Sequence, residues 1–156
     1  MRNKIFVTRA DFHFDLQRFA DAVTYIDANC TELTVSNATI LTGNETTLNA
    51  SRYVVNDNIT ISNTLKISGE VHLILADGKK LTVNCGSGEG ISSTNTSDKL
   101  NIYCQANPSG ELEVTGTSTH AITVYGGITI NGGKITANSP AQGFKLTKTS
   151  LLTAER

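Results

Sequence analysis

The chain has 156 residues and a formal net charge of −1, and 38% of its residues are hydrophobic. This length suits a single domain with room for one core. A near-neutral charge offers no electrostatic surface for nucleic acid or an anionic membrane, so we expect neither nucleic-acid binding nor membrane insertion.

Residues 1–28 differ from the rest of the chain, since four of the five phenylalanines lie in the stretch MRNKIFVTRADFHFDLQRFADA. The basic start is not followed by the run of about 7–15 apolar residues that marks a standard secretory signal. Asp11 is a candidate N-cap for a short helix to about Ala22, with Phe12 and Leu16 on one face. We expect residues 1–28 to form a helical or irregular cap, or a targeting segment, beside a domain of residues 29–156.

From Leu33 onward, short segments alternate apolar and polar residues, which predicts half-buried β-strands. Corners rich in Gly, Asn, Ser and Asp separate these segments, which can be arranged in rows of three. The rows are LTVSN, ATILT and TTLNA from Leu33; YVVND, ITIS and LKIS from Tyr53; VHLIL, KLTVN and GISST from Val71; KLNIY, ELEVT and AITVY from Lys99; and GITIN, KITAN and GFKLT from Gly127. The last three rows begin at a constant 28-residue spacing.

Three strands per row and a repeated spacing predict an all-β fold, namely a right-handed parallel β-helix with three faces. One row cannot bury its own apolar side, so successive rows must stack around a continuous core. The pair Gly132 and Gly133 supplies the positive φ angles that a sharp corner needs. Two alternatives stay open. One is a 19-residue spacing that aligns Lys80 with Lys99, and the other is an antiparallel β-sandwich.

The alternation also predicts which side chains face the core. We expect an aliphatic set to point inward: Leu73, Leu81, Val83, Leu100, Ile102, Leu112, Val114, Ile122, Val124, Ile128, Ile130, Ile135 and Leu146. Cys85 and Cys104 fall at inward positions on different faces, where we expect no disulfide between them. Together with Cys30 they form no C-x-x-C pair, so we expect no metal site and no cofactor.

Glu111 and Glu113 are the closest carboxylates on a predicted outward face, about 7 Å apart along one strand. That separation suits the acid pair of a glycosidase. The three-faced arrangement, however, places Lys134 beside them on the next row, which favours an exposed charge ladder. The cluster that a Ca²⁺-dependent polysaccharide lyase needs is missing. We therefore expect no catalytic residues, and interpret His72 and His120 as ordinary surface residues.

Tyr103 and Tyr125 follow the inward-facing Ile102 and Val124 and are therefore expected to be exposed. Exposed aromatic rings can stack on the flat faces of sugars. The two tyrosines are candidate binding residues, although the prediction places them on different faces of the molecule.

Residues 53–138 resemble a group of bacterial surface and secreted β-solenoid proteins, many of them labelled carbohydrate-binding or adhesin-like. The stretches that carry the resemblance are YVVNDNITISNTLKISGEVHLILADGKKLTVN, LNIYCQANPSGELEVTG and GITINGGKITAN. They cover a little over half of the chain and consist of core and turn residues, with no catalytic set. The chain departs from the group in having Ser118–Ile122 where a Gly-rich corner is common, and in being shorter. A second, short likeness links FDLQRFA (Phe14–Ala20) to the start of other bacterial and phage-encoded proteins, including some capsid proteins.

The resemblance implies a non-catalytic surface or secreted module that is structural or adhesive, with a polysaccharide or a cell surface as its partner. It implies an extracellular or cell-surface location. Because no apolar run follows the basic start of the chain, we expect that location to be reached by a route other than a standard cleaved signal. Two other functions stay open: a polysaccharide lyase or glycoside hydrolase of the β-helix type, and a phage-associated structural protein. Because stacked rows leave unpaired strand edges, we also expect self-association, as a homo-oligomer or a head-to-tail filament.

Overall fold

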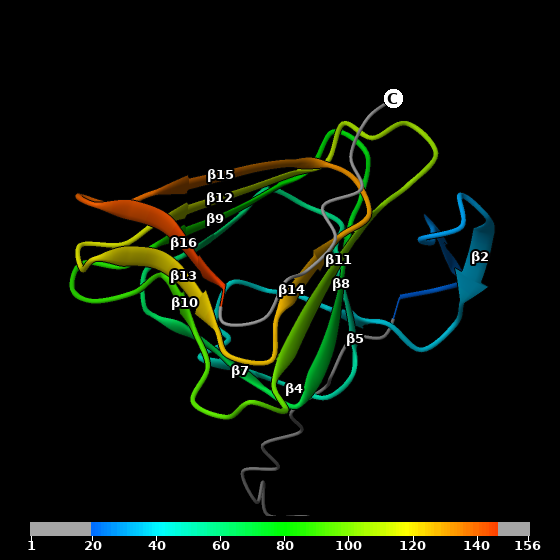
Figure 1. Ribbon diagram of the computed structural model, residues 1–156. Coiled ribbons are helices and arrows are strands. Elements are labelled where there is room, and N and C mark those ends of the chain that lie inside the picture. The colour runs from blue at the N-terminus through cyan, green and yellow to red at the C-terminus, as the bar shows by residue number, and fades with distance from the viewer. Residues whose placement is uncertain (1–19, 147–156) are drawn as a thin grey trace, which may run out of the picture.

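The structure is a computed structural model that describes residues 20–146. Every regular element in these residues is a β-strand, and most of the strands form three parallel sheets (Figure 1). Sheet I contains β3 (Thr39–Ile40), β5 (Arg52–Val55), β8 (Glu70–Leu75), β11 (Lys99–Cys104) and β14 (Ile128–Ile130). Sheet II contains β6 (Ile59–Ile61), β9 (Lys80–Asn84), β12 (Glu111–Thr115) and β15 (Lys134–Asn138). Sheet III contains β4 (Thr47–Asn49), β7 (Leu65–Ser68), β10 (Ile91–Ser92), β13 (His120–Val124) and β16 (Gln142–Leu146).

From β5 onward the chain visits sheets I, II and III in turn, so each strand pairs with the strand three places later. This order confirms the four predicted rows that begin at Tyr53, Val71, Lys99 and Gly127. All pairings within the three sheets are parallel, which rules out the antiparallel sandwich. The chain is therefore an all-β protein built from stacked parallel strands.

The separation along the chain between paired residues is not constant, so the prediction of one fixed period is wrong in detail. On sheet I, Leu100 pairs with Val71 before it and Ile128 after it, and these two separations are nearly equal. On sheet II, Leu112 pairs with Leu81 before it and Ile135 after it, and the first separation is clearly the longer. The corners absorb these differences, because a corner can gain residues without disturbing a strand. The 19-residue alternative is also wrong, since β9 and β11 belong to different sheets.

The three sheets pack around one core (Figure 1). Eleven of the thirteen residues predicted to point inward are buried in it, and Ile135 is partly buried against it. The side chain of the thirteenth, Leu146, lies outside the described residues. Cys85 and Cys104 are also buried, at strand ends on different sheets. Their sulfur atoms make separate hydrogen bonds, to the carbonyl oxygens of Ser87 and Asn131 respectively.

The corner between β14 and β15 shows why two glycines are needed there. Gly132 and Gly133 have φ angles of 150° and 86°, in the region that L-residues with side chains rarely adopt. A Cβ atom on Gly132 would also collide with the sulfur of Cys104. The corner turns the chain from sheet I to sheet II, so it does not form the hairpin that the same sequence also allows.

The first predicted row is wrong in part. Its segment LTVSN does not join the parallel sheets; it supplies β2 (Glu32–Val35), which pairs antiparallel with β1 (Val23–Ile26). Asp27 forms the turn between them by accepting hydrogen bonds from the backbone N–H groups of Asn29 and Thr31. Alternation predicts a strand but not its direction or its neighbour.

This β1–β2 hairpin packs on the outer face of sheet I (Figure 1). Val23 and Tyr25 lie against Val54, Ile74 and Tyr103, which point away from the main core. Two hydrogen bonds fix the hairpin in place. The Gln105 side chain donates to the Thr24 carbonyl oxygen at 3.2 Å, and the Ala20 N–H donates to the Ala38 carbonyl oxygen at 2.9 Å.

The predicted helix from Asp11 lies mostly outside the described residues, and its last residues, 20–22, are not helical. The described part of the segment 1–28 is neither helical nor wholly irregular, because it contains β1. It also lies beside sheet I rather than over the end of the stacked strands. No helix among residues 20–146 has the length and apolar character needed to cross a membrane.

Candidate binding site

Polar side chains form a row across the outer face of sheet I. Arg52 on β5 pairs in register with His72 on β8, His72 with Asn101 on β11, and Asn101 with Thr129 on β14. Residues two apart along a strand point to the same face, so Glu70 and Ile74 share this face with His72. The apolar residues of the face lie under the hairpin, and the polar ones lie beside it.

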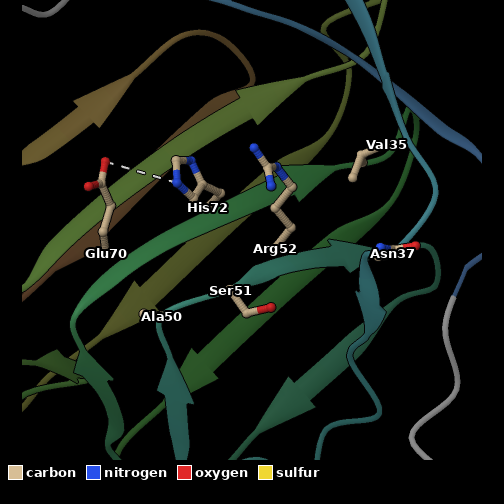
Figure 2. Close-up of a pocket in the computed structure, with 7 residues that line it drawn as sticks. All are labelled: Val35, Asn37, Ala50, Ser51, Arg52, Glu70 and His72. Carbon is tan, nitrogen blue, oxygen red and sulfur yellow. Dashed lines mark ion pairs between the residues drawn. The ribbon is translucent and has the colours of Figure 1, made fainter.

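A groove with a volume of about 400 Å³ opens where the hairpin meets this polar row. Its lining residues come from the end of the hairpin, the turn before β5, the start of β5, and β8: Val35, Asn37, Ala50, Ser51, Arg52, Glu70 and His72. Figure 2 shows Glu70, His72 and Arg52 standing side by side on the sheet, with Val35 and Asn37 beyond Arg52. The hairpin thus forms one side of the groove, and the outer face of sheet I forms its floor.

Glu70 is held by neighbours on two strands. Its Oε1 atom accepts a hydrogen bond from the Asn101 side-chain nitrogen at 3.1 Å and lies 3.9 Å from His72 Nε2. Its Oε2 atom lies 3.9 Å from Lys99 Nζ. The negative charge of Glu70 is therefore balanced on the side away from Arg52.

His72 connects this carboxylate to Tyr103. Its Nδ1 atom lies 3.1 Å from the Tyr103 hydroxyl, and the two rings stack with centroids 5.9 Å apart. Burial lowers the pKa of His72 below 6.5, and the Arg52 guanidinium lowers it further, against the opposing effect of Glu70. His72 is accordingly neutral at pH 7. With a carboxylate facing Nε2, the favoured tautomer has its proton on Nε2, and Nδ1 accepts a hydrogen bond from Tyr103.

Arg52 differs from the other charged residues of the groove. It is exposed, and its side chain makes no hydrogen bond or ion pair with another residue in the range 20–146. Its planar guanidinium has five N–H donors in a fixed arrangement. The groove therefore contains a carboxylate that is already bound and a cation that has no partner among residues 20–146.

The two tyrosines singled out in the sequence are not the exposed rings that the alternation predicts. Tyr103 is partly buried because the hairpin covers it, and its ring meets the Tyr25 ring edge-on at a centroid distance of 4.9 Å. Burial raises the pKa of Tyr103, and Tyr25 adds to this effect. Tyr125 is also partly buried and lies just after β13, so the two rings do not share a face.

Glu111 and Glu113 form the charge ladder that the sequence predicts. Lys134 Nζ lies 3.3 Å from Glu111, and Lys80 Nζ lies 2.5 Å from Glu113 and 3.9 Å from Glu111. The hydrogen bond from Lys80 lowers the pKa of Glu113. Sequence reasoning placed Lys134 beside the pair but missed Lys80, which comes from the preceding strand of sheet II.

Sequence reasoning missed the groove itself. It treated His72 as an ordinary surface residue and did not single out Arg52 or Glu70. A signal for the site was present in the sequence, because polar residues occupy aligned positions on successive strands of sheet I. This row of polar residues lines a groove, however, only because the hairpin packs beside it. His120 lies elsewhere, where its Nε2 atom contacts the Gln142 side-chain oxygen at 3.2 Å.

Within residues 20–146 no three His, Cys, Asp or Glu side chains are grouped so that they could hold a metal ion. No protein-family model matches the chain, and neither a characterised protein nor a solved structure is detectably similar to it.

Proposed function

We propose that the chain is a three-faced, right-handed β-solenoid that serves as a non-catalytic, glycan-binding module of a surface or secreted protein. The observation that carries this proposal is the groove between the hairpin and sheet I. The solenoid architecture is supported by the strand order, because from β5 onward consecutive strands join sheets I, II and III in turn and the three sheets share one core.

The composition of the groove supports a sugar ligand. Binding sites are concave and use a few fixed polar groups to orient the ligand. Here a carboxylate, an imidazole, an amide and a hydroxyl line the same hollow, in Glu70, His72, Asn37 and Ser51. Such groups exchange hydrogen bonds with the hydroxyl groups of a sugar, and β8 holds two of them, Glu70 and His72, on a rigid sheet.

The pairing of Glu111 and Glu113 supports a module without catalysis. An acid pair for hydrolysis needs one carboxyl group with a raised pKa and a cleft for the sugar. The pKa of Glu113 is instead lowered by Lys80, and both carboxylates bind lysines on the outer face of sheet II.

Filling the groove provides the test of this proposal. Ser51→Trp places a large side chain at the groove, and Thr60→Trp places the same side chain on the exposed outer face of sheet II as a matched control. We expect the unaltered protein and Thr60→Trp to bind polysaccharides in affinity electrophoresis, and Ser51→Trp to lose this binding. Equal binding by both variants would place the site elsewhere. No binding by the unaltered chain to any neutral or acidic polysaccharide would overturn the proposal.

A second candidate function is a polysaccharide lyase, and the contact between His72 and Tyr103 favours it. These groups can exchange a proton, and they lie beside an arginine. The test is to incubate the protein with polymers of sugar acids and to follow the ultraviolet absorbance of an unsaturated product. Activity that disappears in His72→Gln would support the lyase, and binding without product supports the non-catalytic module.

A further inference from the structure

The charges in the groove are distributed unevenly, and this bears on which glycans it would accept. Glu70 is engaged by Asn101 and Lys99, whereas the guanidinium of Arg52 has no partner among the described residues. An arginine that faces a groove without a carboxylate partner is a ready site for an anionic group, because its donors match the two oxygens of a carboxylate.

Two residues with neutral donors line the same groove as Arg52. Ser51 precedes Arg52 in the chain and has a hydroxyl group, and Asn37 lies beyond Arg52 at the end of the hairpin (Figure 2). The Asn37 side-chain oxygen accepts a hydrogen bond from the Ser36 hydroxyl, which leaves its NH₂ group as a donor. This end of the groove therefore contains one cation and two neutral donors.

The other end of the groove suits a hydroxyl group. The His72 Nε2 and Glu70 Oε1 atoms are 3.9 Å apart, which is too far for a good hydrogen bond. A sugar hydroxyl between them can accept a hydrogen bond from His72 and donate one to Glu70. The Tyr103 hydroxyl, bound to Nδ1, keeps the His72 ring in the required orientation.

We propose that the groove binds a sugar-acid residue of an acidic polysaccharide, with its carboxylate on Arg52 and a neighbouring hydroxyl between His72 and Glu70. This inference rests on the proposed glycan-binding function and names the class of glycan. Arg52 is then the residue that determines specificity, since among the described residues that line the groove it alone has a charge that an acidic sugar can neutralise.

The test compares four polysaccharides: polygalacturonate, its fully methyl-esterified form, dextran and dextran sulfate. Methyl esterification removes the charge of each sugar while keeping its ring, and dextran sulfate offers sulfate groups on another backbone. We expect polygalacturonate to bind at least about tenfold more tightly than its methyl ester, because hydrogen bonds to charged groups are among the stronger ones.

Two variants make the comparison specific to the groove. Arg52→Gln removes one positive charge from the groove, and Lys66→Gln removes one from an exposed position on sheet III. We expect Arg52→Gln to lose the preference for polygalacturonate over its methyl ester, and Lys66→Gln to keep it. Arg52 is exposed, so both variants should fold, which circular dichroism checks.

Each outcome separates this inference from the function on which it rests. Equal binding of polygalacturonate and its methyl ester, unaffected by Arg52→Gln, would overturn the acidic specificity and leave a neutral-glycan module. Equal losses in Arg52→Gln and Lys66→Gln, with dextran sulfate binding best, would reduce the effect to non-specific charge attraction, which salt screens. Absence of binding to all four polysaccharides would contradict the glycan-binding function itself.

Discussion

The outer faces of sheets I and II are built from the same alternation but differ in how their charges are paired. On sheet II, Lys80 and Lys134 neutralise Glu111 and Glu113 across neighbouring strands. On sheet I, Glu70 is balanced while Arg52 is left without a partner among the described residues. The comparison shows that a strand face becomes a candidate site where its charges are not already paired with each other.

The two faces also differ in what covers them. The hairpin buries the outward-pointing Val54 and Ile74 of sheet I as completely as residues of the main core, with about 1% of each exposed. Thr60 on sheet II points outward in the same way and is exposed. A flat sheet provides no concavity, so the hairpin is the element that turns one of two similar faces into a groove.

The largest expected effect comes from Ile74→Asp, which places a charge on the face of sheet I that the hairpin covers. A charge at this buried position must either be desolvated or displace the hairpin, so we expect a loss of at least about 3 kcal/mol in the free energy of unfolding. Urea denaturation measures it, and limited proteolysis near Asp27 reports release of the hairpin. Thr60→Asp on sheet II is the control, expected within about 0.5 kcal/mol of the unaltered protein. Equal stability of the two variants would show that the hairpin does not cover sheet I.

A smaller loss is expected for Tyr103→Phe, which removes the hydroxyl that contacts His72 and keeps the ring under the hairpin. One intramolecular hydrogen bond contributes about 1 kcal/mol, and denaturation should show a loss of that size. Tyr25→Phe is the matched control, because the Tyr25 hydroxyl makes no hydrogen bond with another residue in the range 20–146. A greater loss from Tyr25→Phe would contradict the proposed orientation of His72.

The pKa of His72 offers a more local measure of the Arg52 charge. Burial and Arg52 lower this pKa below 6.5, while Glu70 raises it and Tyr103 and Asn101 add no charge at pH 7. We expect Arg52→Gln to raise the pKa of His72, measured by NMR titration of its ring. An unchanged pKa would show that Arg52 does not face His72.

The same shift has a consequence for stability. Because the pKa of His72 is lower in the folded state, its contribution to stability is fully present above pH 6.5 and is lost as the pH falls through the folded pKa. The free energy of unfolding of His72→Gln should therefore fall less than that of the unaltered protein as the pH is lowered from 6.5 through the folded pKa of His72.

The smallest effect is expected for Glu113→Gln on sheet II. The side chains of Lys80 and Glu113 are partly exposed, and ion pairs in contact with solvent contribute little because water and salt screen them. We expect no measurable change in the midpoint of thermal unfolding. A clear decrease in this midpoint would mean that the Lys–Glu charge ladder helps to hold the strands of sheet II together. The outer faces of sheets I and II would then both contribute to stability.

Much of the fold could be predicted from particular residues. The alternation in KLTVN and ELEVT placed Leu81, Val83, Leu112 and Val114 in the core, and all four are fully buried. The paired glycines 132 and 133 predicted a corner. The exposure of Tyr103 could not be predicted correctly, because Tyr25 and the rest of the hairpin that covers it lie far earlier in the chain.

The sequence by itself determined which residues form the strands of the parallel sheets, which side of each of these strands faces the core and where the chain turns between them. These features depend on neighbours along the chain, since alternation and glycine act locally. Only the tertiary structure decided the lengths of the turns, the antiparallel direction of β2 and the packing of the hairpin on sheet I. Those depend on pairings between distant segments, for which one alternating strand serves as well as another. The groove belongs to this second group, because Arg52, Glu70 and His72 meet Asn37 only after the hairpin has packed on the sheet.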